Sequence, residues 1–133
     1  MASSVYLLFD PGHDDMSLVR AGHPPPLLVN KDGIRFLTEV GSPVHGLGEV
    51  PRPALHQPFC IGDVLLLYTD GLIERRGESI EVGLARLQAA GEELLTGLDA
   101  ATDLDEVLAK LAEAVSDPDR HDDVAVLAFR RMV

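Results

Sequence analysis

The sequence predicts an α+β fold, because its apolar segments favour strands first, then two helices, then one final strand. Three observations carry this prediction. An Asp-Gly turn at 32–33 separates two short β-prone runs, an unbroken apolar run covers Val64–Thr69, and apolar residues recur at helical spacing over 104–115. The chain has 133 residues and a hydrophobic fraction of 46%, enough for the core of one domain. We therefore expect a single domain over residues 1–133.

Short β-prone runs separated by turn-forming residues fill the first part of the chain. These runs are Val5–Phe9, Met16–Ala21, Leu27–Asn30 and Ile34–Leu37. The first two predict a hairpin with a loose loop, and the last two a tight hairpin, because Asp32-Gly33 supplies positive φ angles. Gly22-His23 and the three prolines that follow exclude a helix or a central strand there. Residues 41–58 are rich in Gly and Pro and predict a long surface loop.

The second part of the chain changes from strand to helical periodicity. Val64–Thr69 does not alternate, which predicts a strand buried on both faces. Apolar residues at helical spacing over 84–95 predict one helix. A second apolar stripe over 104–115 predicts another, with Thr102 or Asp103 as its N-cap. Val124–Phe129 predicts the last strand.

Composition excludes several classes of partner. A formal net charge of −11 disfavours nucleic acid, whose phosphates such a surface would repel. The longest apolar runs are too short to cross a bilayer, so we expect no membrane association through a spanning segment. Cys60 is the only cysteine and cannot form an internal disulfide, which fits a reducing cytoplasm. The sequence therefore favours a cytoplasmic protein.

Two acidic loops are each joined to an apolar strand. Asp70 directly follows Val64–Thr69, and Asp122-Asp123 directly precede the last strand. If the two strands are antiparallel neighbours, these carboxylates share one edge of the sheet. Clustered carboxylates repel one another unless a cation lies between them, and oxygen ligands suit Mg²⁺ or Mn²⁺. Taken singly, each motif is more simply an ordinary turn or polar loop; together they suggest a metal site.

The motifs in their order resemble a known family. Ala21–Leu28 contains Ala-Gly-His-Pro-Pro-Pro, Gly62–Leu72 contains Tyr-Thr-Asp-Gly, and His121–Leu127 contains His-Asp-Asp-Val. Together they resemble the SpoIIE-like branch of the metal-dependent (PPM-type) bacterial serine/threonine protein phosphatases. The resemblance implies a β-sandwich flanked by helices, with a two-metal Mn²⁺ or Mg²⁺ site at one end. It also implies that water attacks phosphorus directly, without a phosphoenzyme.

The resemblance assigns roles to individual residues. Asp70 and Asp122 match metal ligands of the family, and no catalytic group beyond the metal site is implied. Gly71 and Asp123 lie beside these ligands, and Asp123 is expected to orient the loop or a water there. His121 adjoins the same loop, either as an acid or hydrogen-bond donor or, more simply, as a solvated loop residue. Gly22 and His23 match a structural turn near the site.

One expected motif is missing from the sequence. The family's domain opens with a motif like D-V-x-G-H-G, whose aspartate bridges the two metals. Asp10-Pro11-Gly12-His13 is only superficially similar, because it falls in the first hairpin. We therefore expect the C-terminal portion of the domain, with a sandwich incomplete at the N-terminus. The opening strands, the first metal motif and the bridging ligand would lie outside this chain.

The implied function is metal-dependent hydrolysis of phosphoserine or phosphothreonine on a regulatory protein of the anti-sigma-factor-antagonist type. An alternative is a truncated or degenerate phosphatase domain that acts as a non-catalytic protein-interaction module. A third possibility is a carboxylate metal site used in other phosphoester chemistry. Missing strands would leave sheet edges unpaired, and such edges favour pairing between two copies of the chain to form a homodimer.

Overall fold

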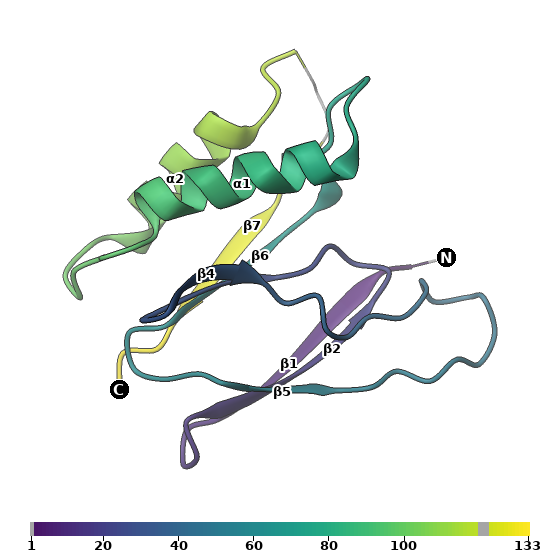
Figure 1. Cartoon of the computed structure of the whole chain (residues 1–133), viewed down its shortest axis with the longest axis horizontal. Helices are drawn as coiled ribbons and strands as arrows, with labels where there is room; N and C mark the ends of the chain where they lie inside the picture. The colour runs from purple at the N-terminus through teal and green to yellow at the C-terminus, as the bar shows by residue number, and fades with distance from the viewer. Residues whose placement is uncertain (1, 120–122) are drawn as a thin grey trace.

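The computed structural model describes residues 2–119 and 123–133 and has an α+β architecture in three layers. Two antiparallel sheets are stacked face to face, and two helices cover the outer side of one of them (Figure 1). The predicted fold class is thus confirmed. The elements in chain order are β1 (Ser4–Asp10), β2 (Asp15–Ala21), β3 (Leu27–Asn30), β4 (Gly33–Phe36), β5 (Leu55–Pro58), β6 (Val64–Tyr68), the 3₁₀ helix η1 (Asp70–Leu72), α1 (Ile80–Leu94), α2 (Leu104–Val115) and β7 (Val126–Arg130).

The smaller sheet has the strand order β1-β2-β5. Its β1–β2 hairpin was expected from the sequence and runs in register from Ser4 opposite Ala21 to Asp10 opposite Asp15. The third strand, β5, was not predicted, because residues 41–58 were expected to form a loop throughout. Leu55–Pro58 pairs with the start of β2 instead. Four residues flanked by prolines carry too little periodicity to identify an edge strand from the sequence.

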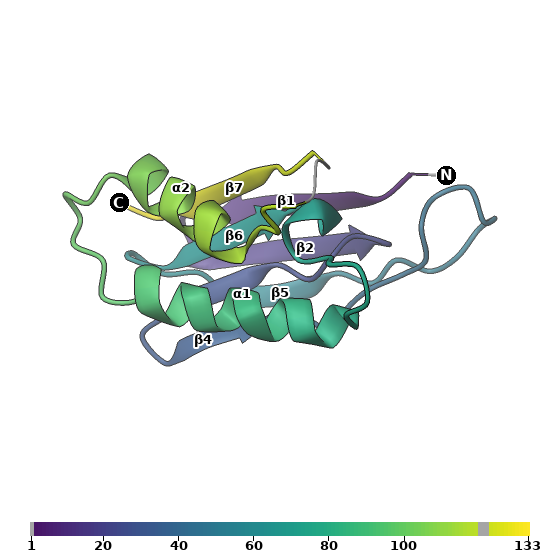
Figure 2. The ribbon, with the colours of Figure 1, turned by 90° about the horizontal axis from the view of Figure 1, so that it is seen from above.

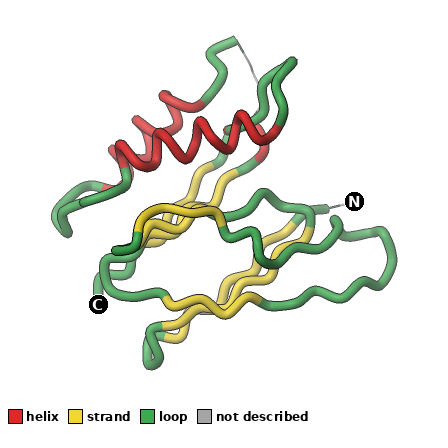
Figure 3. Tube along the Cα trace, viewed as in Figure 1, coloured by secondary structure: helices red, strands yellow, loops and turns green. Residues whose placement is uncertain are grey.

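The larger sheet has the strand order β4-β3-β6-β7 and contains the two strands that matter for the candidate site. The tight β3–β4 hairpin forms as predicted, with Asn30 opposite Gly33. β6 pairs antiparallel with both β3 and β7, so it lies in the interior of the sheet. Figure 3 shows the strands of this sheet between the helices and the smaller sheet.

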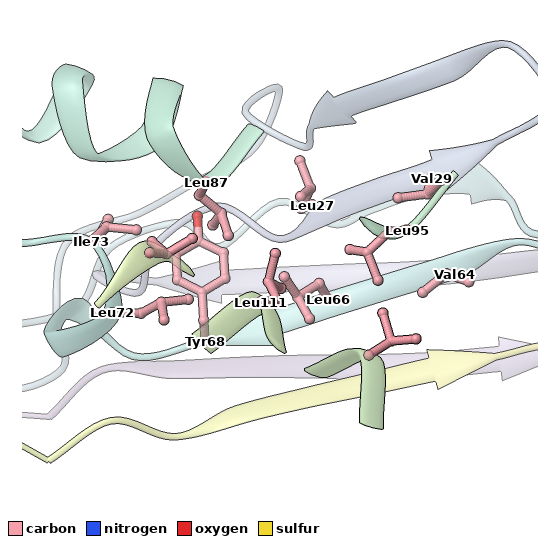
Figure 4. Packing of buried hydrophobic residues seen from close by; sticks show 12 residues of the cluster. Leu27, Val29, Val64, Leu66, Tyr68, Leu72, Ile73, Leu87, Leu95 and Leu111 are labelled. Carbon is pink, nitrogen blue, oxygen red and sulfur yellow. The ribbon is translucent and has the colours of Figure 1, made fainter. Parts of the chain in front are cut away.

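The central strand β6 is buried on both faces, as its unbroken apolar run predicts. Leu66 and Tyr68 join a cluster that packs against the helices and includes Leu87 and Leu111 (Figure 4). Leu65 joins a second cluster between the two sheets, whose other members are Met16, Leu18, Leu28, Leu37 and Phe59. Each removal of such a side chain from water stabilises the fold by about 1.5–3 kcal/mol. The end of β6 is therefore fixed from two sides.

The two helices lie side by side over the larger sheet (Figure 2). In α2 the Asp103 side chain accepts a hydrogen bond from the Asp105 amide (2.9 Å), the N-cap that the sequence indicates. In α1 the N-cap is Ser79, whose side chain makes no capping bond. No helix among the described residues is long and apolar enough to cross a membrane.

Candidate active site

The end of β6 and the segment leading into β7 meet at one edge of the larger sheet. The last register pair is Tyr68 opposite Val126. Beyond it the Thr69 amide donates to the Ala125 carbonyl (3.1 Å), and the Ala125 amide donates back to Thr69 Oγ1 (3.0 Å). β6 and β7 are therefore antiparallel neighbours, the condition on which the predicted shared edge depends. Asp70 and Asp123 are each only one or two residues beyond this bonded pair.

Gly71 allows the closest approach between these two segments. A Cβ at this position would overlap the carbonyl oxygen of Asp123, a backbone atom that cannot move aside alone. The one-turn helix η1 starts here, where the Asp70 carbonyl accepts from the amides of Ile73 (3.0 Å) and Glu74 (2.9 Å). The Asp-Gly pair therefore ends the strand and turns the chain tightly at the site.

A cavity of about 350 Å³ lies at this edge of the sheet. It is lined by Ser3, His23, Pro24, Thr69, Asp70, Gly71, Glu74 and Asp123. Four residues singled out from the sequence, His23, Asp70, Gly71 and Asp123, therefore share one cavity. Asp122 and His121, the other two sequence candidates at this edge, lie outside the described residues.

Glu74 and Ser3 line the cavity without having been identified from the sequence. Glu74 lies four residues after Asp70, a spacing that places two side chains on one side of a helical turn. Recognising a helical turn after the strand would have found this carboxylate. Ser3 comes from the opposite end of the chain, and no local pattern connects it with Asp70.

His23, which follows the turn at Gly22, forms part of the cavity wall together with Pro24. Gly22 has a φ of +60°, and a Cβ there would overlap the side chain of Val44. Its amide donates to the Ser42 carbonyl (2.7 Å). Arg20 Nη1 donates to the His23 carbonyl (2.7 Å), while two other nitrogens of the same guanidinium donate to the Val40 carbonyl. The backbone of His23 is therefore held by a glycine turn, a half-buried arginine and three prolines.

Tyr68 connects this wall to the strand that carries Asp70. Its hydroxyl donates to the Pro25 carbonyl at 2.6 Å. Burial raises the pKa of the Tyr68 hydroxyl well above its ordinary value, so the phenol stays protonated as this bond requires. The proline turn and the end of β6 are thereby fastened to each other beside the cavity.

A larger cavity of about 810 Å³ also has Glu74 in its lining, together with the start of α1 and residues of the loop after α2. A network of charged side chains holds its walls. Arg86 pairs with Glu78 (2.6 Å), and Arg75 Nη2 donates to the Val115 carbonyl (2.9 Å). Asp70 does not line this cavity, and these contacts join the loop before α1 to α1 itself and to the end of α2.

The acidic side chains at this edge of the sheet are of the type that binds hard divalent cations. Asp70, Glu74 and Asp123 offer only oxygen donors, which Mg²⁺ and Mn²⁺ prefer. Within residues 2–119 and 123–133, however, no three His, Cys, Asp or Glu side chains are grouped so that they could hold a metal ion. The described part of the site is compatible with a metal but does not enclose one.

The fold of two stacked antiparallel sheets and helices matches that of PP2C phosphatase domains of known structure. The chain is similar to the RsbU and RsbW domains of Rv1364c from Mycobacterium tuberculosis, with 31% identity and a TM-score of 0.75. The match covers 90% of this chain and 34% of that one. It is also similar in fold to the SiaA-PP2C domain of Pseudomonas aeruginosa (19% identity, TM-score 0.68, 96% and 51% covered).

A further structural relative is the phosphatase domain of SpoIIE from Bacillus subtilis, with 15% identity, a TM-score of 0.63, and 98% of this chain and 59% of that one covered. The family described as Stage II sporulation protein E (SpoIIE) matches residues 1–132. The chain therefore belongs to the SpoIIE family, as the sequence motifs indicate. It spans between a third and three fifths of the length of these three solved relatives.

Proposed function

We propose that this chain carries part of the active site of a metal-dependent phosphatase acting on phosphoserine or phosphothreonine of a regulatory protein. One observation supports the proposal above the others. Asp70 and the segment entering β7, which are far apart in sequence, meet at one sheet edge and share a cavity. The family relation supports the same reaction class, because the structural relatives include phosphatase domains.

We propose a separate role for each residue at this edge of the sheet. Asp70 and Asp122 would hold Mg²⁺ or Mn²⁺, with Gly71 allowing the close approach of the backbone and Asp123 and His121 supporting the loop. When bound, such ions lower the pKa of water and offset the negative charge of a phosphate group. A bridging aspartate would come from outside this chain. Residues 1–133 alone should then bind the metal weakly.

The proposed substrate is a phosphoprotein of the anti-sigma-factor-antagonist type in bacterial partner switching. A substrate of this kind needs an open site, and the cavity at Asp70 lies at a sheet edge lined partly by exposed residues. The single cysteine supports a cytoplasmic setting. We treat residues 1–133 as one structural unit, the C-terminal portion of the phosphatase domain.

A second candidate function is a non-catalytic interaction module that forms homodimers. β1 and β7 are both edge strands, and the sequence already indicates unpaired edges. Tyr6 is 63% exposed, Leu8 56% and Leu127 53%. A cavity of about 390 Å³ lined by residues of β1, β6 and β7 lies along the same side of the sandwich. Exposed apolar edge strands are templates for pairing with a second chain.

The test compares Asp70→Asn with wild type in the longest natural polypeptide that contains this chain. Mn²⁺-dependent hydrolysis of p-nitrophenyl phosphate should fall at least about 100-fold, because even residues that only support metal ligands cost 10–100-fold. Asp32→Asn, at the exposed β3–β4 turn, is the matched control and should keep full activity. An unchanged rate in Asp70→Asn would refute the catalytic assignment and leave the interaction module.

Calorimetric titration of residues 1–133 with Mn²⁺ tests the incomplete site separately. We expect weak binding that Asp70→Asn weakens further. Tight binding of two ions by this short chain would contradict the assignment of the bridging ligand to another segment.

A further inference from the structure

We propose that Leu47, at the tip of the loop between β4 and β5, contacts an apolar side chain of the phosphoprotein substrate and strengthens its binding. The inference rests on the proposed phosphatase function and deepens it, because it assigns a specificity-determining residue outside the cavity that contains Asp70. Leu47 is 58% exposed, so much of its side chain can contact another protein. The contact that we infer is with an apolar surface residue close in space to the phosphoserine.

The loop over residues 37–54 reaches the same end of the sandwich as the candidate active-site cavity. Ala2 and His45 form an antiparallel β-bridge, in which the Ala2 amide donates to the His45 carbonyl (3.3 Å) and the His45 amide donates back (2.7 Å). Ser3, the residue after Ala2, lines the cavity. Figures 1 and 2 show this loop extending past the N-terminal end of β1. Leu47 therefore follows, by two residues, a backbone contact beside the site.

Hydrogen bonds close the base of this loop. Arg52 Nη1 donates to Ser42 Oγ (2.6 Å) and to the Pro43 carbonyl (2.9 Å), so the two sides of the loop are joined. The Ser42 amide in turn donates to the carbonyl of Arg20 in β2 (3.0 Å). Compact surface loops whose ends are held close together frequently carry function. These bonds attach the loop to the sandwich, and none of them involves Leu47.

Two glycines shape the backbone on either side of Leu47. Gly46 has a φ of +96° and Gly48 a φ of +93°, values in the region that favours glycine. An added Cβ at Gly48 would meet no atom within 4 Å, so the backbone conformation, and not a lack of space, favours glycine there. Single exposed leucines are common on protein surfaces. This leucine differs because a closed loop presents it on a sharply turned backbone next to a candidate active site.

The chemistry of this end of the molecule indicates the kind of contact. A leucine side chain gains free energy when it leaves water, so Leu47 favours an apolar neighbour. The net charge of −11 repels acidic side chains that would surround a phosphorylated residue. A substrate with an apolar residue near its phosphoserine therefore fits better than one with an acidic residue there.

The experiment compares two phosphoserine peptides with the longest natural polypeptide that contains this chain, assayed with Mn²⁺. Each peptide has about seven residues on either side of the phosphoserine, which span about 23 Å when extended. One peptide carries leucine at alternate positions, and the other carries glutamine there. Wild type should have the lower KM for the leucine peptide. Leu47→Ser should raise that KM about 10-fold, the effect expected from losing one apolar contact, without changing kcat.

The glutamine peptide and p-nitrophenyl phosphate lack a group for Leu47 to contact. Their kinetics in Leu47→Ser should therefore equal those of wild type, and they also report whether the variant folds and retains its metal. Leu47→Met keeps an apolar side chain of similar size and should have nearly the wild-type KM for the leucine peptide. This second variant separates the loss of an apolar contact from a general disturbance of the loop.

A second exposed aliphatic residue provides the matched control. Ile61 is 64% exposed, and the amide of the next residue, Gly62, donates to the Arg131 carbonyl (2.8 Å). Arg131 follows the last residue of β7, whereas Asp70 lies beside the segment that enters β7, so Ile61 is at the opposite end of the strand. Ile61→Ser should keep the wild-type KM for both peptides.

Several results would overturn the proposal. Equal KM values of wild type for the two peptides, or an unchanged KM of Leu47→Ser for the leucine peptide, would mean that Leu47 does not contact the substrate. Equal losses on the peptides and p-nitrophenyl phosphate would mean that Leu47 maintains the site instead, and an equal rise of KM in Ile61→Ser would show that the effect is not specific to the loop. All of these leave the proposed phosphatase function standing, because wild type still hydrolyses its substrates. A wild-type polypeptide that hydrolyses none of them would overturn the phosphatase function together with the role of Leu47.

Discussion

The two sheets of the sandwich share a core between them but differ on their outer faces. The β4-β3-β6-β7 sheet is covered by α1 and α2 (Figure 2), whereas the outer face of β1-β2-β5 carries exposed Tyr6 and Leu8. The candidate active site lies at the edge of the covered sheet. The difference teaches that the candidate carboxylate Asp70 follows a strand buried on both faces, while the outer face of the smaller sheet leaves apolar side chains exposed.

The burial of β6 explains why its end can position a carboxylate. Leu65 packs toward the other sheet and Leu66 toward the helices, and neither is accessible to solvent. A strand held from both faces moves little, and metal or phosphate binding needs donors held to within a fraction of an ångström. β1 has no such support on its outer face.

The largest expected effect comes from leucine-to-alanine substitutions in the two sheets. Leu66→Ala should destabilise the chain by about 3 kcal/mol, because it leaves a cavity beneath the helices. Leu8→Ala on the bare face should cost less than about 1 kcal/mol, because Leu8 is already more than half exposed. Urea unfolding followed by circular dichroism measures both. Equal losses would show that a partner or another segment covers the bare face and would break the comparison.

A smaller effect is expected from glycine-to-alanine substitutions at the strand ends of the two sheets. Gly71→Ala should cost about 1–3 kcal/mol, because its Cβ would collide with the Asp123 backbone. It should also lower hydrolysis of p-nitrophenyl phosphate by separating the two halves of the site. At Gly12, in the β1–β2 turn, the nearest atom to an added Cβ is Asp10 Oδ1 at 3.5 Å, an ordinary contact. Gly12→Ala should therefore leave both stability and activity unchanged, and a comparable loss there would argue against steric collision as the cause.

The sequence predicted those parts of the fold that local patterns determine. The hairpins, the buried strand β6 and the capped helix α2 all follow from short-range periodicity and turn chemistry. The edge strand β5 did not, because its four residues are stabilised by pairing with β2, a contact that no local pattern encodes. Strand formation there depends on tertiary context.

The candidate site likewise contains residues that sequence patterns could place and residues that only tertiary contacts bring there. Asp70 and Asp123 could be placed at one edge only on the condition that their two strands are antiparallel neighbours, a condition that the pairing of β6 with β7 meets. Ser3 could not be placed there, and the Gly22-His23 turn could be placed near the site only by family resemblance. The turn is held by bonds from Arg20 to the carbonyls of Val40 and His23, and Ser3 lies beside it with its Oγ 3.4 Å from His23 Nδ1. The ligand role of Asp122 stays a prediction, since that residue lies outside the described part of the chain.

The smallest expected effect comes from removing one tyrosine hydroxyl in each of the two sheets. The chain has one tyrosine in each sheet, and Tyr68→Phe removes a buried hydrogen bond and leaves the Pro25 carbonyl without its donor. It should cost about 1–2 kcal/mol, whereas Tyr6→Phe should cost nothing measurable, because no hydrogen bond from its exposed hydroxyl is present in the described structure. Urea unfolding of both variants measures these two changes in stability.

Phosphopeptide hydrolysis by the same variants shows whether this bond also positions the cavity. If Tyr68→Phe lowers the rate while Tyr6→Phe does not, the hydrogen bond between Tyr68 and Pro25 positions the cavity wall as well as stabilising it. A Tyr68→Phe variant as stable as wild type would show that the three prolines alone hold that wall in place.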